Sequence, residues 1–173
     1  MCKVHIFRRN RYRLNDNPRN ARMIVGDRTS GNDEEKESDA AVALIVNDGQ
    51  FLVIKRKQRE GDPWSGDMAL PGGFRKEGET PAEAARRESM EEVGIRPEIL
   101  HFIGTYSSLR AKISVNVYLS KFTESIPPVA GPEVSEAFWV PFRMLQQGEN
   151  CFNYGPYRIW GLTFRILRDY LST

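Results

Sequence analysis

The feature that most constrains the fold is one helix whose start and end are both marked in the sequence. Thr80 can cap its first turn, Pro81 suits the first helical position, and Glu83 completes a Thr-x-x-Glu capping box. Gly94 is the residue type at which helices commonly end in a left-handed conformation. A turn is expected immediately upstream, because residues 70–73 read Leu-Pro-Gly-Gly. The sequence therefore predicts a turn followed by a single helix that ends before Gly94.

Three glutamates lie on one arc of this predicted helix. Glu88, Glu91 and Glu92 are spaced i, i+3 and i+4, so their side chains are neighbours on the helical surface. Like charges at these spacings destabilise an isolated helix. A hard divalent cation, which prefers oxygen ligands, would compensate them. A solvated acidic face is the alternative interpretation, since runs of charge on a helix commonly face water.

The residues around the glutamates extend this pattern. In chain order they are Gly73, Glu79, Arg87-Glu88, Glu91-Glu92 and Gly94-Ile95. This run resembles the Nudix box, G-x5-E-x7-R-E-U-x-E-E-x-G-U, where U is a bulky or aliphatic residue. Ser89 at the first U position is the one loose fit. The resemblance implies the Nudix fold and the hydrolysis of a diphosphate linked to another moiety, with Mg²⁺ or Mn²⁺ as the cofactor.

Composition restricts the class of protein. The chain has 173 residues, of which 40% are hydrophobic and 28% charged, with a net charge of +2. These values are typical of a soluble globular domain, and the net charge is too small to indicate a nucleic-acid or membrane partner. His5 and His101 are too few for a multi-histidine zinc site, and Cys2 and Cys151 lack metal-like spacing. We therefore expect a protein of the reducing cytoplasm, with a homodimer left open. A small-molecule diphosphate substrate is what the Nudix resemblance implies.

Residues 1–39 differ in composition from the rest of the chain. They are basic as far as Thr29 and acidic from Asp33 onward. We expect an extension that is partly docked on a domain spanning residues 40–173. An RNA-contacting arm, a segment that grips anionic substrate and an organellar presequence are the alternatives. The acidic residues weaken the last of these, because presequences are poor in acidic residues.

The remaining segments predict strands around the helix. Residues 41–46 and 51–54 are apolar runs joined by Asn-Asp-Gly-Gln, which is a hairpin signal. Residues 113–120 alternate apolar and polar side chains, as a half-buried strand does. Further elements are expected as strands at 99–106 and 137–140, a short helix at 142–147, and a C-terminal amphipathic helix marked by Trp160, Phe164, Leu167 and Leu171. We expect an α+β protein, an α/β/α sandwich on a mixed sheet, with Trp160 in its core. The Nudix fold has this architecture, with the box helix and the C-terminal helix flanking the sheet.

Three segments outside the box resemble one branch of the Nudix family, the coenzyme A pyrophosphatases. They are GDMALPGG at residues 66–73, EVSEAFWVP at 133–141 and YRIWGLT at 157–163. In the branch's upstream signature only Leu52 and Arg56 match, and the loop from Arg56 to Gly66 is longer than usual. The branch implies cleavage of coenzyme A or an acyl derivative into 4′-phosphopantetheine and adenosine 3′,5′-bisphosphate. The alternatives are ADP-ribose, a nucleoside triphosphate, an RNA 5′ end, or a non-catalytic binding module.

The family resemblance also implies residue roles. Glu88 and Glu92 are expected to be the principal metal ligands, and Glu91 a further or water-mediated one. The carbonyl of Gly72 is expected to supply an additional oxygen. Arg87 lies within helical reach of Glu91 and is expected to orient the carboxylates rather than to touch substrate.

A carboxylate must also accept a proton from the attacking water. The candidates are Glu88, Glu133 and Glu136, and the sequence leaves the choice between them open. Glu79, upstream of the helix, is expected to help fix the loop. The candidate phosphate contacts are four cations, for each of which a solvated surface charge is the alternative: Arg56, Arg59, Arg110 and Lys112. Of these, Arg56 and Lys112 are the residues we expect to bind substrate.

Overall fold

A computed structural model describes residue 35 and residues 37–108, 112–124 and 126–172. The elements within them are, in chain order, β1 (Ala40–Asn47), β2 (Gln50–Arg56), β3 (Met68–Ala69), β4 (Gly72–Phe74), α1 (Pro81–Val93), β5 (Glu98–Ser108), β6 (Ile113–Lys121), β7 (Val134–Pro141), the 3-10 turn η1 (Phe142–Met144), β8 (Gln146–Gly148), β9 (Cys151–Tyr154), β10 (Tyr157–Trp160) and α2 (Gly161–Leu171). Residues 1–34, with the basic part of the predicted extension, lie outside the described residues. The role of that extension and the domain boundary at residue 40 stay predictions.

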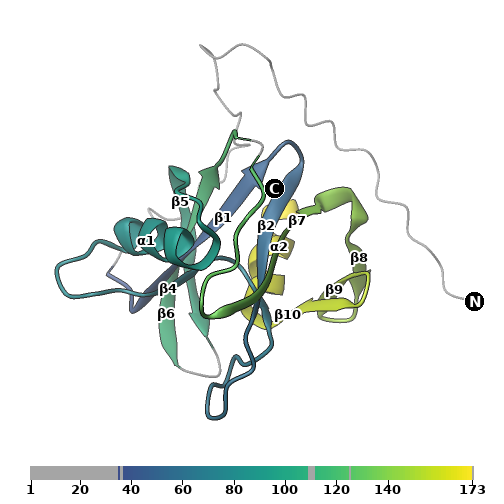
Figure 1. Cartoon of the computed structure of the whole chain (residues 1–173), viewed down its shortest axis with the longest axis horizontal. Coiled ribbons are helices and arrows are strands. Elements are labelled where there is room, and N and C mark those ends of the chain that lie inside the picture. Colours follow the sequence, from purple (N-terminus) through teal and green to yellow (C-terminus); the bar gives the residue numbers. More distant parts are fainter. Residues whose placement is uncertain (1–34, 36, 109–111, 125, 173) are drawn as a thin grey trace, which may run out of the picture. The chain divides into compact units, whose positions relative to one another are not determined.

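The described strands form two sheets (Figure 1). The larger sheet has seven strands in the order β3-β2-β1-β6-β5, with β4 also paired to β1 and β7 to β2. Strands β1 and β6 run parallel, whereas the other pairs in this sheet are antiparallel. The smaller sheet has three strands in the order β10-β9-β8. The larger sheet is therefore mixed, as the sequence predicts.

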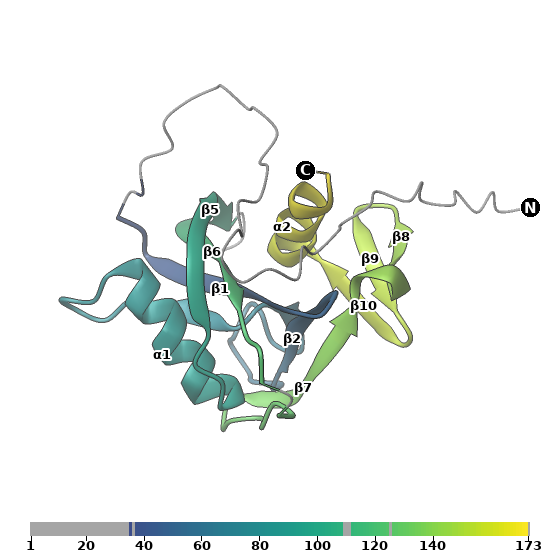
Figure 2. The same cartoon turned by 90° about the horizontal axis from the view of Figure 1, so that it is seen from above.

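The two helices cover opposite faces of the larger sheet (Figure 2). Side chains alternate between the faces along β1, because successive residues of a strand point to opposite sides. Ala41 and Ile45 consequently pack in the core that contains Val93 of α1. Leu44 packs in the other core, with Leu167 of α2. The layers of helix, sheet and helix confirm the α/β/α sandwich.

Helix α1 has the ends that the sequence predicts. The Thr80 hydroxyl accepts a hydrogen bond from the Glu83 N–H at 3.3 Å, and the Glu83 carboxylate accepts one from the Thr80 N–H at 2.8 Å. Gly94 has a φ of 68°, in the left-handed region, and its N–H donates to the Met90 carbonyl. An N-cap of this kind contributes about 1 kcal/mol. The predicted capping box and stop are both confirmed.

The segment between β7 and α2 differs from the prediction. The helix expected at 142–147 is wrong, since only Phe142–Met144 form a single 3-10 turn before the small sheet begins. Asn150 (φ 55°) and Gly155 (φ 53°) adopt left-handed conformations in the turns of that sheet. Its strands have three or four residues each, which is too short for an alternating pattern to be recognised. Trp160 ends β10 and is only partly buried, so its expected place in the core is wrong as well.

The described helices are short. Helix α1 has 13 residues and α2 has 11. No helix in the described part of the chain is long and apolar enough to cross a membrane. The cytoplasmic location and the homodimer stay predictions.

Candidate active site

Glu92 is buried against the Gly-Gly turn. The residue is 5% exposed, and its Oε2 accepts a hydrogen bond from the Gly72 N–H at 2.9 Å. Burial disfavours the charged form and raises the pKa of Glu92 from 4.5 to about 7, with a smaller contribution from the negative charge of Glu88. The hydrogen bond from Gly72 opposes this rise. A buried carboxylate of this kind is stabilised by a cation, because buried charges need a partner or a metal ion.

Glu88 lies against the backbone of β4, and glycine is required for that approach. A Cβ atom at Gly73 would lie 2.6 Å from the Cδ atom of Glu88, closer than atoms can pack. A Cβ atom at Gly72, which has a φ of 153°, would lie 2.3 Å from the Ala41 carbonyl oxygen. Both glycines of the turn therefore serve to bring the backbone next to the helix carboxylates and to β1.

Arg87 binds three carboxylates at the same wall. Its Nε and Nη2 donate to the two oxygens of Glu79 at 2.7 and 3.0 Å. Its Nη1 donates to Glu88 Oε1 at 2.6 Å and to Glu91 Oε2 at 3.2 Å, and Nη2 also donates to the Phe74 carbonyl at 3.0 Å. The hydrogen bonds from Arg87 lower the pKa of Glu79 to about 2, and the hydrogen bonds that Arg87 donates to Glu79 and Glu88 raise the pKa of Arg87. The geometry suits an orienting residue, which is the role predicted for Arg87.

The loop before β7 brings Glu133 to this wall. The Val129 N–H donates to the Val93 carbonyl at 2.9 Å, and the Gly131 N–H donates to the Glu92 carbonyl at 2.8 Å. These bonds satisfy carbonyls at the C-terminal end of α1, which have no partner within the helix. A Cβ atom at Gly131 would lie 2.1 Å from the Glu91 carbonyl oxygen, so the close approach needs glycine. The end of the loop is thereby held beside α1.

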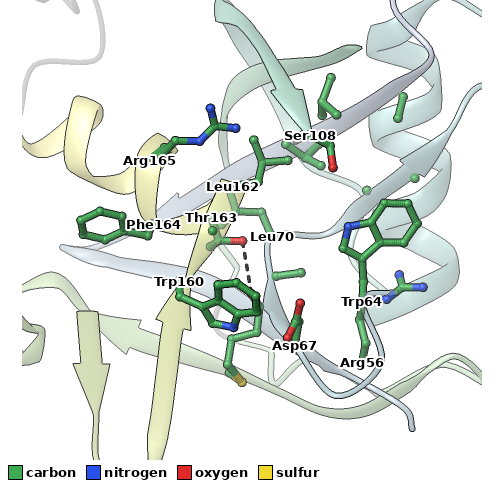
Figure 3. Close-up of a pocket in the computed structure, with 18 of the residues that line it drawn as sticks. Arg56, Trp64, Asp67, Leu70, Ser108, Trp160, Leu162, Thr163, Phe164 and Arg165 are labelled. Carbon is green, nitrogen blue, oxygen red and sulfur yellow. Dashed lines mark hydrogen bonds between the residues drawn. The ribbon is translucent and has the colours of Figure 1, made fainter. Parts of the chain in front are cut away.

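A cavity of about 600 Å³ separates this acidic wall from helix α2. Figure 3 shows the α2 side of it, with Thr163, Phe164 and Arg165. Glu88, Glu92 and Glu133 line one side of it, together with the Gly-Gly turn. The other side is lined by the first turns of α2 and the residue before it, from Trp160 to Arg168. The fold therefore places the carboxylates of α1 opposite a second wall that comes from the C-terminal part of the described chain.

The chemistry of the carboxylates fits a hard divalent cation. Glu88 and Glu92 are one helical turn apart and offer oxygen atoms to the same cavity. Glu91 is 53% exposed, and the described residues that line the cavity do not include it. Among the described residues, no three histidine, cysteine, aspartate or glutamate side chains are grouped to hold one ion. Glu88 accepts a hydrogen bond from Arg87, and Glu92 accepts one from the Gly72 N–H. The metal-ligand roles stay predictions.

Glu136, a predicted catalytic residue, lies elsewhere. Its Oε1 accepts from Lys55 Nζ at 3.0 Å, and its Oε2 accepts from the Tyr157 hydroxyl. The hydrogen bond from Tyr157 is the main reason that the pKa of Glu136 is lowered. The three side chains line a second hollow of about 380 Å³, which is lined by none of the box glutamates. The structure therefore brings Glu133, and not Glu136, together with Glu88 and Glu92.

The predicted substrate contacts are divided. Arg56 lines the cavity, but its Nη2 is paired with Asp62 Oδ2 at 3.0 Å. Lys112 is exposed and is not among the described residues that line either hollow. Arg59 pairs with Glu133 at 2.9 Å, and Arg110 lies outside the described residues. Arg56 is consequently the predicted phosphate contact that the fold places at the site.

Several cavity residues were not singled out as site residues from the sequence. They are aromatic or cationic, and they come from the β2–β3 loop, β4, β10 and α2: Trp64, Phe74, Trp160, Arg165 and Arg168. A helical period marks one face of α2 as apolar but does not say that its first turn borders a cavity. A tryptophan within a polar loop was the available signal at Trp64.

Residues 36–158 match the NUDIX domain. The chain belongs to the Nudix family. It is 45% identical over 69 residues to an ADP-ribose pyrophosphatase of Methanocaldococcus jannaschii, an alignment that covers 40% of this chain and 39% of that protein. It is 28% identical over 117 residues to an 8-oxo-dGTP diphosphatase of Haemophilus influenzae, covering 67% of this chain and 85% of that protein. Among solved structures, the MutT NUDIX hydrolase of Burkholderia pseudomallei superposes with a TM-score of 0.53 at 27% identity, covering 75% of this chain and 94% of that one.

Proposed function

We propose that this Nudix chain is a metal-dependent hydrolase that cleaves the diphosphate bond of a nucleoside diphosphate linked to another moiety. The observation that carries the proposal is the placement of Glu88 and Glu92 at one wall of a cavity of about 600 Å³. Ligand pockets in proteins have volumes of about 300–1,000 Å³, so a nucleotide-sized substrate fits. The retained box carboxylates argue against the non-catalytic alternative, because a binding module has no use for them.

Two Nudix-box glutamates, Glu88 and Glu92, would hold Mg²⁺ or Mn²⁺, with the Gly72 carbonyl as an additional oxygen. Such a cation neutralises phosphate oxygens and activates a water for attack at phosphorus. Arg87 keeps Glu88 in position through the 2.6 Å hydrogen bond and is itself fixed by both oxygens of Glu79. The ion-paired network therefore sets the direction in which the carboxylates face the substrate.

Glu133 is our candidate for the general base. It lines the same cavity as the metal-ligand candidates, and its carboxylate is held at 2.9 Å by Arg59 Nη1. A base must lie within hydrogen-bond reach of the water that it deprotonates, which favours Glu133 over Glu136. Glu88, the remaining candidate, would have to serve as both ligand and base.

Coenzyme A or an acyl derivative is the substrate that we propose. The support comes from the segments at 66–73, 133–141 and 157–163, which resemble the coenzyme A branch and all contribute residues to the cavity. ADP-ribose is the second candidate, because the relative that is 45% identical over 69 residues is an ADP-ribose pyrophosphatase. That alignment covers 39% of the relative, so it supports the shared chemistry more than the shared substrate.

The test is a panel of diphosphates incubated with Mg²⁺ and then with Mn²⁺, with the products identified by mass. The panel contains coenzyme A, acetyl-coenzyme A, ADP-ribose, 8-oxo-dGTP and a 5′-triphosphorylated RNA. We expect 4′-phosphopantetheine and adenosine 3′,5′-bisphosphate from coenzyme A, and no product in excess chelator. Faster turnover of ADP-ribose or a nucleoside triphosphate than of any coenzyme A species would reject the branch. Undiminished turnover in chelator would reject the metal mechanism.

A further inference from the structure

Two of the three tryptophans line the candidate active-site cavity instead of filling a core. Trp64 and Trp160 both border it and are partly buried, and neither belongs to the two core clusters of the described residues. Figure 3 shows them on either side of the cavity, with Asp67 and Leu70 between them. Trp139 differs, because it packs against the core under α1 and stacks on Phe122 with ring centroids 6.4 Å apart.

The loop that carries Trp64 is internally bonded. Asp62 Oδ1 accepts from the Trp64 N–H at 2.9 Å, and Asp62 Oδ2 accepts from Arg56 Nη2 at 3.0 Å. The Trp64 carbonyl accepts from the Asp67 N–H at 3.1 Å, and the Asp67 carbonyl accepts from the Arg56 N–H at 3.0 Å. The loop is thus tied at both sides of Trp64 to the end of β2. Arg56 therefore has a second role, which is to position this loop.

The aromatic wall continues directly from the acidic wall. Trp64 meets Phe74 in an edge-on contact, with ring centroids 6.4 Å apart. Phe74 follows Gly73, whose backbone lies against the Glu88 carboxylate. A diphosphate at Glu88 and Glu92 would therefore place its next chemical group beside Trp64 and Phe74. A planar ring is the group that gains most from such a wall, because aromatic side chains stack on the faces of nucleobases.

We propose that Trp64, opposed by Trp160, is the specificity-determining residue that stacks on the nucleobase of the substrate. This inference rests on the proposed function, since it takes the acidic wall as the diphosphate end of the site. It identifies the group that is attached to the diphosphate on the side of Trp64 as a nucleoside. The group at the other end of the diphosphate is left open. Substrates that lack a base, such as a bare diphosphate, lose this contact and bind through the acidic wall alone.

The experiment measures affinity by calorimetry in Mg²⁺ with two ligands that cannot be hydrolysed. One is α,β-methylene-ADP, and the other is methylenediphosphonate, which has the same bridged phosphorus pair without a nucleoside. Base stacking on an aromatic side chain changes affinity by about five- to a hundredfold. We expect Trp64→Leu to lower the affinity for α,β-methylene-ADP by that factor and to leave the affinity for methylenediphosphonate unchanged. Trp64→Phe, which keeps a ring, should restore most of the nucleotide affinity.

The matched control is Trp139→Phe, which alters a tryptophan that the structure places outside the cavity-lining residues. It should leave both affinities unchanged. Equal affinity of wild type and Trp64→Leu for α,β-methylene-ADP would overturn the inference. An equal loss of affinity for both ligands in Trp64→Leu would overturn it as well. No binding of α,β-methylene-ADP to the wild-type chain would overturn it too. Thermal unfolding of each variant checks that it folds, and Trp64→Met, which also lacks a ring, supplies the test if Trp64→Leu does not fold.

The inference and the proposed function fail in different ways. If no diphosphate of the panel is hydrolysed but Trp64→Leu loses affinity for α,β-methylene-ADP and not for methylenediphosphonate, the hydrolase proposal fails and the base contact stands. If diphosphates are hydrolysed with the same KM by wild type and Trp64→Leu, the base contact fails and the hydrolase stands. A rise in KM for nucleotide substrates at unchanged kcat would support both, because a ground-state contact remote from the reacting bond changes binding.

Discussion

Replacing Glu92 by glutamine should stabilise the metal-free protein while abolishing its hydrolytic activity. Burial raises the pKa of Glu92 from 4.5 to about 7. Since one pKa unit corresponds to about 1.4 kcal/mol, the ionised carboxylate costs the folded state on the order of 3 kcal/mol. Glutamine has the same shape, keeps an oxygen that can accept from the Gly72 N–H, and carries no charge. Its amide nitrogen needs a partner of its own, so we expect a net gain of about 2 kcal/mol.

The gain should depend on pH. Because the folded pKa is raised, the folded state holds its proton more strongly than the unfolded state does. Below pH 4.5 the carboxyl group is protonated in both states, and the cost vanishes. The cost grows as the pH rises from 4.5 to about 7 and is fully present above that. The advantage of Glu92→Gln should therefore be largest near pH 8 and fall below about 1 kcal/mol near pH 5.

Urea unfolding of the full chain, followed by circular dichroism in excess chelator at both pH values, measures this gain. Glu91→Gln is the control, because it removes the same charge from the same helix at a side chain that is 53% exposed. It should change the free energy of unfolding by less than about 0.5 kcal/mol. A Glu92→Gln protein that is less stable than wild type at pH 8, or whose advantage grows as the pH falls, would refute the burial argument. Added Mg²⁺ should stabilise wild type more than the variant.

Four further substitutions test the rest of the site. Gly73→Ala places a methyl group 2.6 Å from the Glu88 carboxyl carbon, so kcat should fall at least about tenfold while the fold persists by circular dichroism. Glu133→Gln should lower kcat by about a hundredfold or more, whereas Glu136→Gln should leave it nearly unchanged; the reverse order would exchange their roles. Arg165→Gln, on the α2 side of the cavity, should lower kcat/KM for coenzyme A about tenfold but spare dephospho-coenzyme A, and equal losses on both would exclude recognition of the 3′-phosphate.

Features specified by neighbouring residues could be predicted from the sequence. Helix α1 begins and ends as expected, because Thr80, Glu83 and Gly94 act on the backbone within one turn. The first hairpin is similar, since Asp48 (φ 42°) and Gly49 (φ 74°) supply the two left-handed residues that a two-residue turn requires. In both cases the decisive groups are adjacent in the chain. Their local geometry does not depend on the rest of the fold.

Features that arise from contacts between distant segments could not be predicted in the same way. Strands β8 to β10 exist because each pairs with a neighbour, and none has a pattern of its own. The choice between Glu133 and Glu136 depends on strand direction and on the loop that binds the end of α1. Residues three apart in sequence can thus line two different hollows. Trp160 could be recognised as apolar, but only the tertiary fold shows that it borders a cavity.

On the proposed function, the lining of the cavity divides into residues for the chemistry and residues for selectivity. The acidic wall comes from α1 and the Gly-Gly turn, which match the Nudix box. The rest of the lining comes from the β2–β3 loop, β10 and α2, which contribute Trp64, Trp160 and Arg165, with the two tryptophans on either side of the cavity (Figure 3). The loop is also where the resemblance to the coenzyme A branch is weakest, since only Leu52 and Arg56 match in the strand before it. On this proposal, a change of substrate would need new side chains among these residues, because the carboxylates of the acidic wall would act on any diphosphate that the rest of the cavity admits.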